Sequence, residues 1–267
     1  MSKKGQRKTF EKKVKEIVQM ELDEELEEKI AIVEYPNQVP SREIPTGNIA
    51  ITAQQNVFKL LPAIEQSLPG DAGAKYNMRV GNQINLKEID IDGFLSYRYP
   101  LTDASVAYPD AKLAVRVMIV RAKQFNDTAK AFADMPTNVL IRNGSNLSAH
   151  VGPYGGYTMD SFRDVNRDAF AVRYDKVHYL SAPVEIPGGA TLSSDFGVIP
   201  SGLKMFKHRL KFGKHGIKLN FSNQADTEAE NFPYFLLVGY SSMSGTSRPN
   251  DNLVDMSITC FAKYTDA

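Results

Sequence analysis

The sequence predicts an all-β protein, an antiparallel β-sandwich or jelly roll, with a basic and helical arm at its N-terminus. From residue 49 onward, runs rich in β-branched and aromatic residues alternate with loops that contain glycine, proline and asparagine. Apolar side chains recur at every second position within the runs, as at Val115, Val117 and Ile119. The expected strands are residues 83–98, 112–124, 138–142, 168–181, 204–212, 216–222, 232–243 and 253–264.

Residues 10–33 are expected to form a long helix, because their apolar side chains recur at three- and four-residue steps. An isolated helix of this kind is marginal in water, so its apolar stripe needs a docking surface, either the chain's own core or a partner subunit. Prolines and a glycine then mark a linker. The predicted organisation is an arm over residues 1–35, a linker over 36–48 and a β domain over 49–267.

The composition is that of an ordinary globular protein, with 42% hydrophobic and 24% charged residues in a chain of 267. The sequence contains no run of about 18 apolar residues, so no membrane span is expected. The N-terminal stretch MSKKGQRKTF has no apolar segment behind it, so no secretory signal is expected either. The single cysteine, Cys260, allows no intrachain disulfide and no cysteine zinc cluster.

The sequence offers little that indicates an enzyme. The four histidines (His150, His178, His208 and His215) do not show metal-ligand spacing with each other or with acidic residues. There is no G-x-S-x-G nucleophile elbow. We therefore expect a protein without catalytic residues and without a cofactor.

Charge is distributed unevenly at the N-terminus. Residues 16–34 hold eight acidic side chains against Lys29 alone, whereas the preceding fifteen residues are strongly basic. The basic tip predicts an arm that binds nucleic acid; a solubilising tail and a nuclear-import signal are the alternatives. The candidate nucleic-acid-binding residues of the arm are Lys3, Lys4, Arg7, Lys8, Lys12, Lys13 and Lys15.

A second cationic segment lies at residues 204–218, which contain no acidic side chain. In an extended strand Lys207, Arg209 and Lys211 share one face, and Lys214 follows them. Such a row can bind phosphates as point charges. The alternative is a solvated strand face whose charge is balanced by acidic neighbours.

Glu88, Asp90 and Asp92 form a row of carboxylates at alternate positions of another expected strand. We expect a solvated or ion-paired strand face, with the cationic segment 204–212 or a subunit contact as its counterpart. Calcium binding between subunits is an alternative, since carboxylate oxygens are its usual ligands; a catalytic carboxylate pair is a further one. The apolar alternation changes phase just before the row, which predicts a β-bulge near Lys87 or Glu88.

Six segments of the sequence, in order, resemble the capsid proteins of small circular single-stranded DNA viruses, the group that includes circoviruses and geminiviruses. The resemblance covers about residues 50–267, and includes an Arg-x-Gly-Asn turn at Arg79, Gly81 and Asn82 that leads into what would be the first jelly-roll strand. The remaining segments are LAVRVMIVRAKQ, which would be the second strand, RDAFAVRYDKVHYL with the pair Asp175 and Lys176, KMFKHRLKF, FPYFLLVGYSS and VDMSITCFAKYTD.

The resemblance implies a single eight-stranded jelly roll that self-assembles as a homo-oligomer into a small icosahedral shell. It implies that the basic arm and the cations of the inner surface face a packaged single-stranded DNA, and that the protein resides in the virion and, during assembly, in the host nucleus or cytoplasm. It points to no particular host receptor. The alternatives are the capsid of a small positive-strand RNA virus and a non-viral, lectin-like binding module.

One departure from the family matters for the arm. Relatives usually carry a long arginine-rich arm, whereas residues 1–34 here contain eight basic and nine acidic side chains. The departure weakens the expectation that the arm alone condenses the genome.

Overall fold

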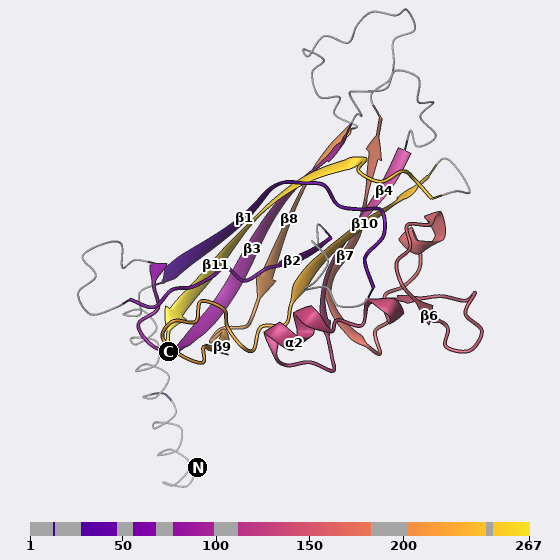
Figure 1. Cartoon of the computed structure of the whole chain (residues 1–267). Coiled ribbons are helices and arrows are strands. Elements are labelled where there is room, and N and C mark those ends of the chain that lie inside the picture. Colours follow the sequence, from indigo (N-terminus) through magenta and orange to yellow (C-terminus); the bar gives the residue numbers. More distant parts are fainter. Residues whose placement is uncertain are drawn as a thin grey trace, which may run out of the picture.

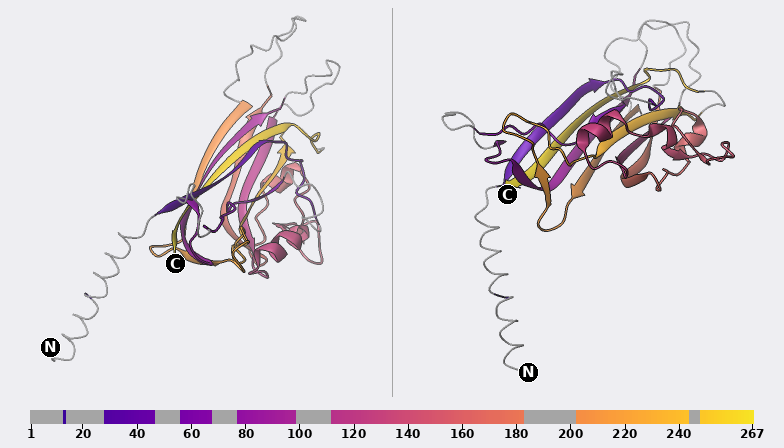
Figure 2. Two further views of the ribbon diagram at one scale, coloured as in Figure 1. Left: turned by 60° about the vertical axis from the view of Figure 1, so that its left-hand side comes forward. Right: turned by 60° about the horizontal axis from the view of Figure 1, so that its bottom comes forward.

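The computed structural model describes residues 28–46, 56–67, 77–98, 112–182, 202–243 and 248–267, together with Lys13. Two antiparallel sheets pack face to face and form a β-sandwich, as Figures 1 and 2 show. The fold is therefore all-β, as the sequence predicted. No helix in the described ranges is long and apolar enough to cross a membrane.

Sheet A contains the longest strands. Its order is β1 (Lys29–Gln38), β11 (Val254–Asp266), β3 (Gln83–Tyr97) and β8 (Leu203–Lys211), and β9 (Ile217–Asn220) pairs with the first part of β3 beyond the end of β8.

Sheet B lies against it. Its order is β2 (Val57–Lys59), β10 (Phe235–Ser242), β4 (Lys112–Ala122) and β7 (Phe170–Ser181).

The connectivity is that of an eight-stranded jelly roll. When the eight strands on the paths of the two described sheets are taken in chain order, the first pairs with the last, the second with the seventh, the third with the sixth and the fourth with the fifth. A long β-hairpin rolled onto itself gives this pairing, and the two sheets it creates are the two layers of the sandwich.

The main core fills the space between the sheets. Its side chains come from alternate positions of β3 and β11, such as Ile89 and Ile91, and from β4 and β10 on the opposite layer. Strands β4 and β10 are buried on both faces, because residues 123–169 fold over the outer side of sheet B. This excursion, seen beside the sandwich in Figure 2, contains α2 (Thr128–Ala133), short 3-10 turns at Thr137–Val139 and Thr158–Ser161, and the small pair β5 (Ile141–Arg142) and β6 (Val151–Gly152).

A partly buried ion pair, in which Arg116 is buried and Asp175 is accessible to solvent, ties the excursion to sheet B. Arg116 on β4 donates two hydrogen bonds, of 2.8 and 2.7 Å, to the carboxylate of Asp175 on β7. The same guanidinium donates to the backbone carbonyls of Asp160 and Arg163 in the excursion, at 2.7 and 2.6 Å. Asp175, which the resemblance singled out beside Lys176, thus has a structural partner.

The prediction that the helix extends to residue 33 is wrong. Residues 29–33 belong to β1, which pairs with β11 along the edge of sheet A. The strand extends to Gln38, so the predicted arm boundary at 35 and linker start at 36 both fall inside the sandwich. Lys13 is helical, and the other residues of the expected helix before Glu28 lie outside the described residues.

Two expected strands do not belong to the eight of the jelly roll. Residues 138–142 contribute only the short β5 in the excursion, and 216–222 contribute β9, which extends one flank of β3. Strands β1 and β2 take their places. Consequently the segment that follows Arg79 forms the third strand of the roll rather than the first, and LAVRVMIVRAKQ forms the fourth rather than the second.

Arg79 joins three segments at the start of β3. Its side chain is fully buried, and its guanidinium carbon lies 4.2 Å from the centre of the Phe221 ring. It donates hydrogen bonds to six oxygens: those of the Gln66 and Asn82 side chains and the backbone carbonyls of Gly81, Asn223, Gln224 and Asp226. The Arg-x-Gly-Asn turn is therefore a buried structural hub.

Replacing Arg79 by methionine should lower the free energy of unfolding by about 3 kcal/mol or more, because buried acceptors lose their donor. Chemical denaturation of the purified variant measures the loss. Arg98→Gln is the matched control, since Arg98 is half-exposed and its ion pair with Asp255 is long, at 3.7 Å. If Arg79→Met lowered the free energy of unfolding no more than the control does, the structural role of Arg79 as a hub would be contradicted.

Candidate nucleic-acid interface

The outer face of sheet A carries the charged rows that the sequence singled out. On β3 the side chains that do not enter the core include Glu88, Asp90 and Asp92. The register of β3 with β8 places these three residues opposite Lys211, Arg209 and Lys207 respectively. The carboxylate row and the cationic row therefore lie side by side on adjacent strands.

The two rows form ion pairs. Lys207 contacts Asp92 at 3.0 Å, and Arg209 pairs with Asp90. From the other flank of β3, Lys263 on β11 contacts Glu88 at 2.5 Å and Asp90 at 3.3 Å. This confirms an ion-paired strand face with segment 204–212 as the counterpart of the acids.

The pairing also bears on the alternative of a calcium site. In the described parts of the chain, no group of three or more histidine, cysteine, aspartate or glutamate side chains could hold a metal ion. Glu88, Asp90 and Asp92 are bridged by lysine and arginine instead. Burial raises the pKa of Asp90, but hydrogen bonds from Arg209 and Lys263 outweigh it and hold that pKa below its usual value. The carboxylate thus stays charged and paired.

A hollow of about 370 Å³ lies over this network, lined by Asp90, Asp92, Lys207, His208, Arg209 and Phe261. Its walls carry both signs of charge. A phosphate that entered it would have to displace carboxylates from Lys207 or Arg209, so these two residues are weaker phosphate ligands than their exposure suggests.

The surplus of positive charge lies further along, where β8 turns into β9. Lys211, Lys214 and Lys218 are exposed, and none of them has an ion-pair partner among the residues that the structure describes. We call these three lysines the cationic end of sheet A. The sequence prediction had included Lys211 and Lys214 but not Lys218, although it closes the same acid-free segment 204–218.

The turn that presents the cationic end has a fixed shape. Gly213 and Gly216 both have positive φ, of 84° and 72°. At Gly216 a Cβ atom would lie 2.4 Å from the carbonyl oxygen of Leu86, so only glycine fits. Beside the turn, Lys87 is the bulged residue of β3, because Lys263 pairs with Glu88 while Tyr264 pairs with Leu86. The predicted bulge is confirmed at this position.

Of the candidate residues of the arm, the structure describes Lys13, which is exposed. Lys3, Lys4, Arg7, Lys8, Lys12 and Lys15 lie outside the described residues. The base of the arm is well defined, because Lys29 is buried and its ammonium contacts Asp266 at 2.5 Å and the Met78 carbonyl at 2.8 Å. Both the base of the arm and the cationic end lie at the end of sheet A where β11 finishes, the lower end in Figure 1.

Two histidines lie on the seam where the edge strands β7 and β8 close the sandwich. The centres of the His178 and Phe206 rings lie 5.4 Å apart and those of His208 and Tyr174 lie 4.6 Å apart, both pairs in a tilted arrangement. The Phe206 ring occupies the space above Gly93, where a Cβ atom would lie 2.1 Å from it. Burial lowers the pKa of both histidines, and Lys176 and Lys204 lower that of His178 further. These histidines pack the seam.

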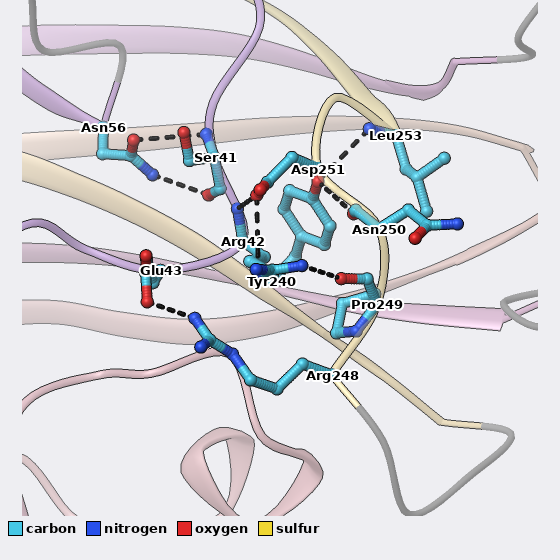
Figure 3. Close-up of polar contacts among 10 residues, drawn as sticks. All are labelled: Ser41, Arg42, Glu43, Asn56, Tyr240, Arg248, Pro249, Asn250, Asp251 and Leu253. Atoms are coloured by element: carbon cyan, nitrogen blue, oxygen red, sulfur yellow. Dashed lines mark hydrogen bonds and ion pairs between the residues drawn. The ribbon is translucent and has the colours of Figure 1, made fainter.

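A polar cluster at the opposite end of the sandwich joins the segment after β1 to the loop before β11 (Figure 3). Arg42 donates a 2.8 Å hydrogen bond to the Pro249 carbonyl, and Arg248 pairs with Glu43. The Tyr240 hydroxyl donates to the Asn250 carbonyl at 2.9 Å and accepts from the backbone N–H of Leu253 at 3.2 Å. The contacts run from loop to loop and to β10, which indicates that the cluster fixes loop geometry.

Protonation of the seam histidines should destabilise the fold in mild acid. Their pKa values are lowered in the folded state, so the unfolded chain binds protons more readily. The free energy of unfolding is therefore fully retained at pH values above the histidine pKa of the unfolded chain, about 6.5, and falls as the pH drops below it. Denaturation at about pH 7 and about pH 5 should show this decrease, and it should shrink in the His178→Gln, His208→Gln double variant. His215→Gln, at the exposed turn, is the control; an unchanged decrease in the double variant would place the effect elsewhere.

If the outer face of sheet A binds nucleic acid, the cationic end should contribute more than the paired cations. Replacing Lys211, Lys214 and Lys218 by glutamine should reduce the slope of log K against log salt by about 2, since each lost phosphate contact on a single strand accounts for about 0.7. Replacing Lys207 and Arg209 should reduce it by less than about 0.7. Fluorescence anisotropy with labelled oligothymidine measures both slopes. Equal losses per residue would show that the ion pairs do not occupy Lys207 and Arg209.

Comparison of the sequence with protein-family models gives no match, and comparison with curated proteins gives none either.

Proposed function

We propose that this chain is a viral capsid protein that self-assembles into a small icosahedral shell and packages a single-stranded genome, DNA by the resemblance. The observation that carries the proposal is the jelly-roll connectivity combined with a basic N-terminal tip, which the acidic residues 16–28 connect to edge strand β1. A jelly roll alone hosts many functions, including those of lectins, so the charge pattern has to support the choice.

The ends of the sandwich differ in a way that suits a shell subunit. The connections over residues 39–56, 98–111, 182–202 and 243–253 all join strand ends at one end of the sandwich, because Tyr97 pairs with Val254 and Lys112 with Ser181. The base of the arm and the cationic end lie at the other end. Subunit contacts and nucleic-acid contacts can thus use separate surfaces.

The charge is modest for one subunit, and this is compatible with packaging. Three exposed lysines and a short basic tip bind phosphates weakly on their own. Many copies held in one shell act on a single polyanion at high effective concentration, so weak sites add up to firm retention. Assembly and packaging therefore support each other in this proposal.

The purified chain should form closed particles that contain nucleic acid. Size-exclusion chromatography with negative-stain microscopy tests the assembly, and nuclease digestion of the extracted contents distinguishes DNA from RNA. Particles with RNA inside would favour the alternative of a positive-strand RNA virus. A stable monomer or dimer at all tested salt concentrations and pH values would exclude the capsid function and favour a binding module.

A further inference from the structure

The cationic end of sheet A has no acidic partner among the residues that the structure describes, although the sequence places a strongly acidic segment directly before β1, which begins at the same end of the sheet. We infer that residues 16–28 of the chain dock on the cationic end of sheet A and occupy Lys211, Lys214 and Lys218 in the absence of nucleic acid. The docking itself is a property of the single chain. Its consequence for packaging, given below, rests on the proposed function.

The position of the segment's attachment makes docking possible. Lys29 begins β1 and lies in one row with Tyr264, Leu86 and Ile217, which crosses sheet A from β1 to β9. Adjacent strands are about 4.8 Å apart, so β9 lies about 14 Å from the root of the segment. Five residues of extended chain span up to about 17 Å, so the segment from Glu24 backward can reach the lysines.

The attachment point is also held in place. The Lys29 ammonium is clamped between Asp266 and the Met78 carbonyl, and Asp266 in turn accepts a hydrogen bond of 2.9 Å from the backbone N–H of Val80. A segment tethered at such a fixed point encounters the nearby lysines at high effective concentration, on the order of millimolar for a short flexible tether. The chain's own segment therefore has an advantage over a segment from a second copy.

Charge complementarity favours this occupant. The segment contains Glu16, Glu21, Asp23, Glu24, Glu25, Glu27 and Glu28 and no basic residue. The cationic end offers three lysines without acidic partners among the described residues, and the bulged Lys87 stands beside them. A single exposed pair contributes little, but several pairs formed by one tethered segment act together.

An apolar contact is available on the same sheet. The segment carries Ile17, Val18, Leu22 and Leu26 at helical spacing. On the outer face of sheet A, Ile32 is 54% exposed on β1 and is paired in register with Phe261, which lines the hollow over the ion pairs. Burying apolar surface here would stabilise the docked segment at salt concentrations that weaken its ion pairs.

The docked segment would act as an internal mimic of the genome. Nucleic acid and the acidic segment compete for the same lysines, so packaging would begin with displacement of the segment. This explains why an arm with a net negative charge can belong to a nucleic-acid-binding subunit: its acids are used against the chain's own cations until a longer polyanion replaces them.

Cysteine cross-linking tests the docking directly. Cys260 is fully buried and burial raises its pKa to about 12, so it does not compete for thiol reagents. The pair Gln19→Cys and His215→Cys leaves every acid of the segment and every lysine of the cationic end in place. A short bismaleimide should cross-link this pair within one chain at low salt, and the yield should fall by about threefold or more at about 1 M salt, where the Debye length is about 3 Å.

Matched variants separate docking from chance encounters. Gln19→Cys with Leu147→Cys, which is 84% exposed in the excursion over sheet B, should cross-link poorly at any salt concentration. In the first pair, adding Lys211→Gln, Lys214→Gln and Lys218→Gln should abolish the salt-sensitive yield, whereas Lys207→Gln should leave it unchanged.

Each outcome decides the inference. Salt-sensitive cross-linking within one chain supports it, and added oligothymidine should then reduce the yield. Covalent dimers in place of the intrachain product would assign the segment to a second copy and overturn docking within the chain. A yield that is independent of salt and of the three lysines would overturn it as well. The cross-linking is measured on the single chain and does not require particles. A protein that never forms particles can therefore still show docking, so failure of the capsid function and failure of the docking are distinguishable.

Discussion

The architecture of sheet A depends on the phase change that the bulge at Lys87 imposes on β3. Before the bulge Ile84 and Leu86 enter the core, and after it Ile89 and Ile91 do so. Without the extra residue, a strand that kept Ile84 and Leu86 in the core would turn Ile89 and Ile91 to solvent and Glu88, Asp90 and Asp92 into the core. The bulge is also the point at which β3 changes its pairing partner. Residues 83–86 of β3 pair with β9, and residues 88–96 pair with β8. A single inserted residue thus sets the core, the polarity of the outer face and the position of the β8–β9 turn.

The ion pairs on the outer face follow from that phase and help to fix register. A slip of β8 by one residue would turn Phe206 and Leu210 outward and place Lys207 and Arg209 in the core. A slip by two would keep the apolar phase but move Arg209 away from Asp90 and the Phe206 ring away from Gly93, which alone leaves space for it. The charges and the glycine therefore discriminate between registers that the hydrophobic pattern permits. Lys207 and Arg209, which made β8 a candidate for binding phosphate, thus also have a structural role.

The sequence was sufficient for the strands whose alternation is local. The bulge, the outward acids and the cationic row on β8 could all be predicted because each depends on neighbours within a few residues. Strand β1 could not be predicted in this way: Ile30 and Val33 continue the helical spacing that begins near Val14, and the competing strand depends on β11. The Lys29–Asp266 contact joins residues 237 positions apart. From sequence, the cationic row was one of two counterparts named for the acids, beside a subunit contact, because the pairing of the rows depends on a β3–β8 register between distant segments.

The place of β1 changes what the arm can do. Because β1 belongs to sheet A, the arm comprises only the residues up to Glu28. Its point of attachment lies where β11 finishes, beside the cationic end. With a linker over residues 36–48, as the sequence had suggested, the attachment of the arm to the sandwich would lie about ten residues or more further along the chain. The base of the arm at Lys29 and the cationic end share one end of the molecule, opposite the long connections. Any assembly that encloses the base of the arm also encloses the cationic end, so the charges of the chain attached at Lys29 and those of the exposed lysines have to be considered together.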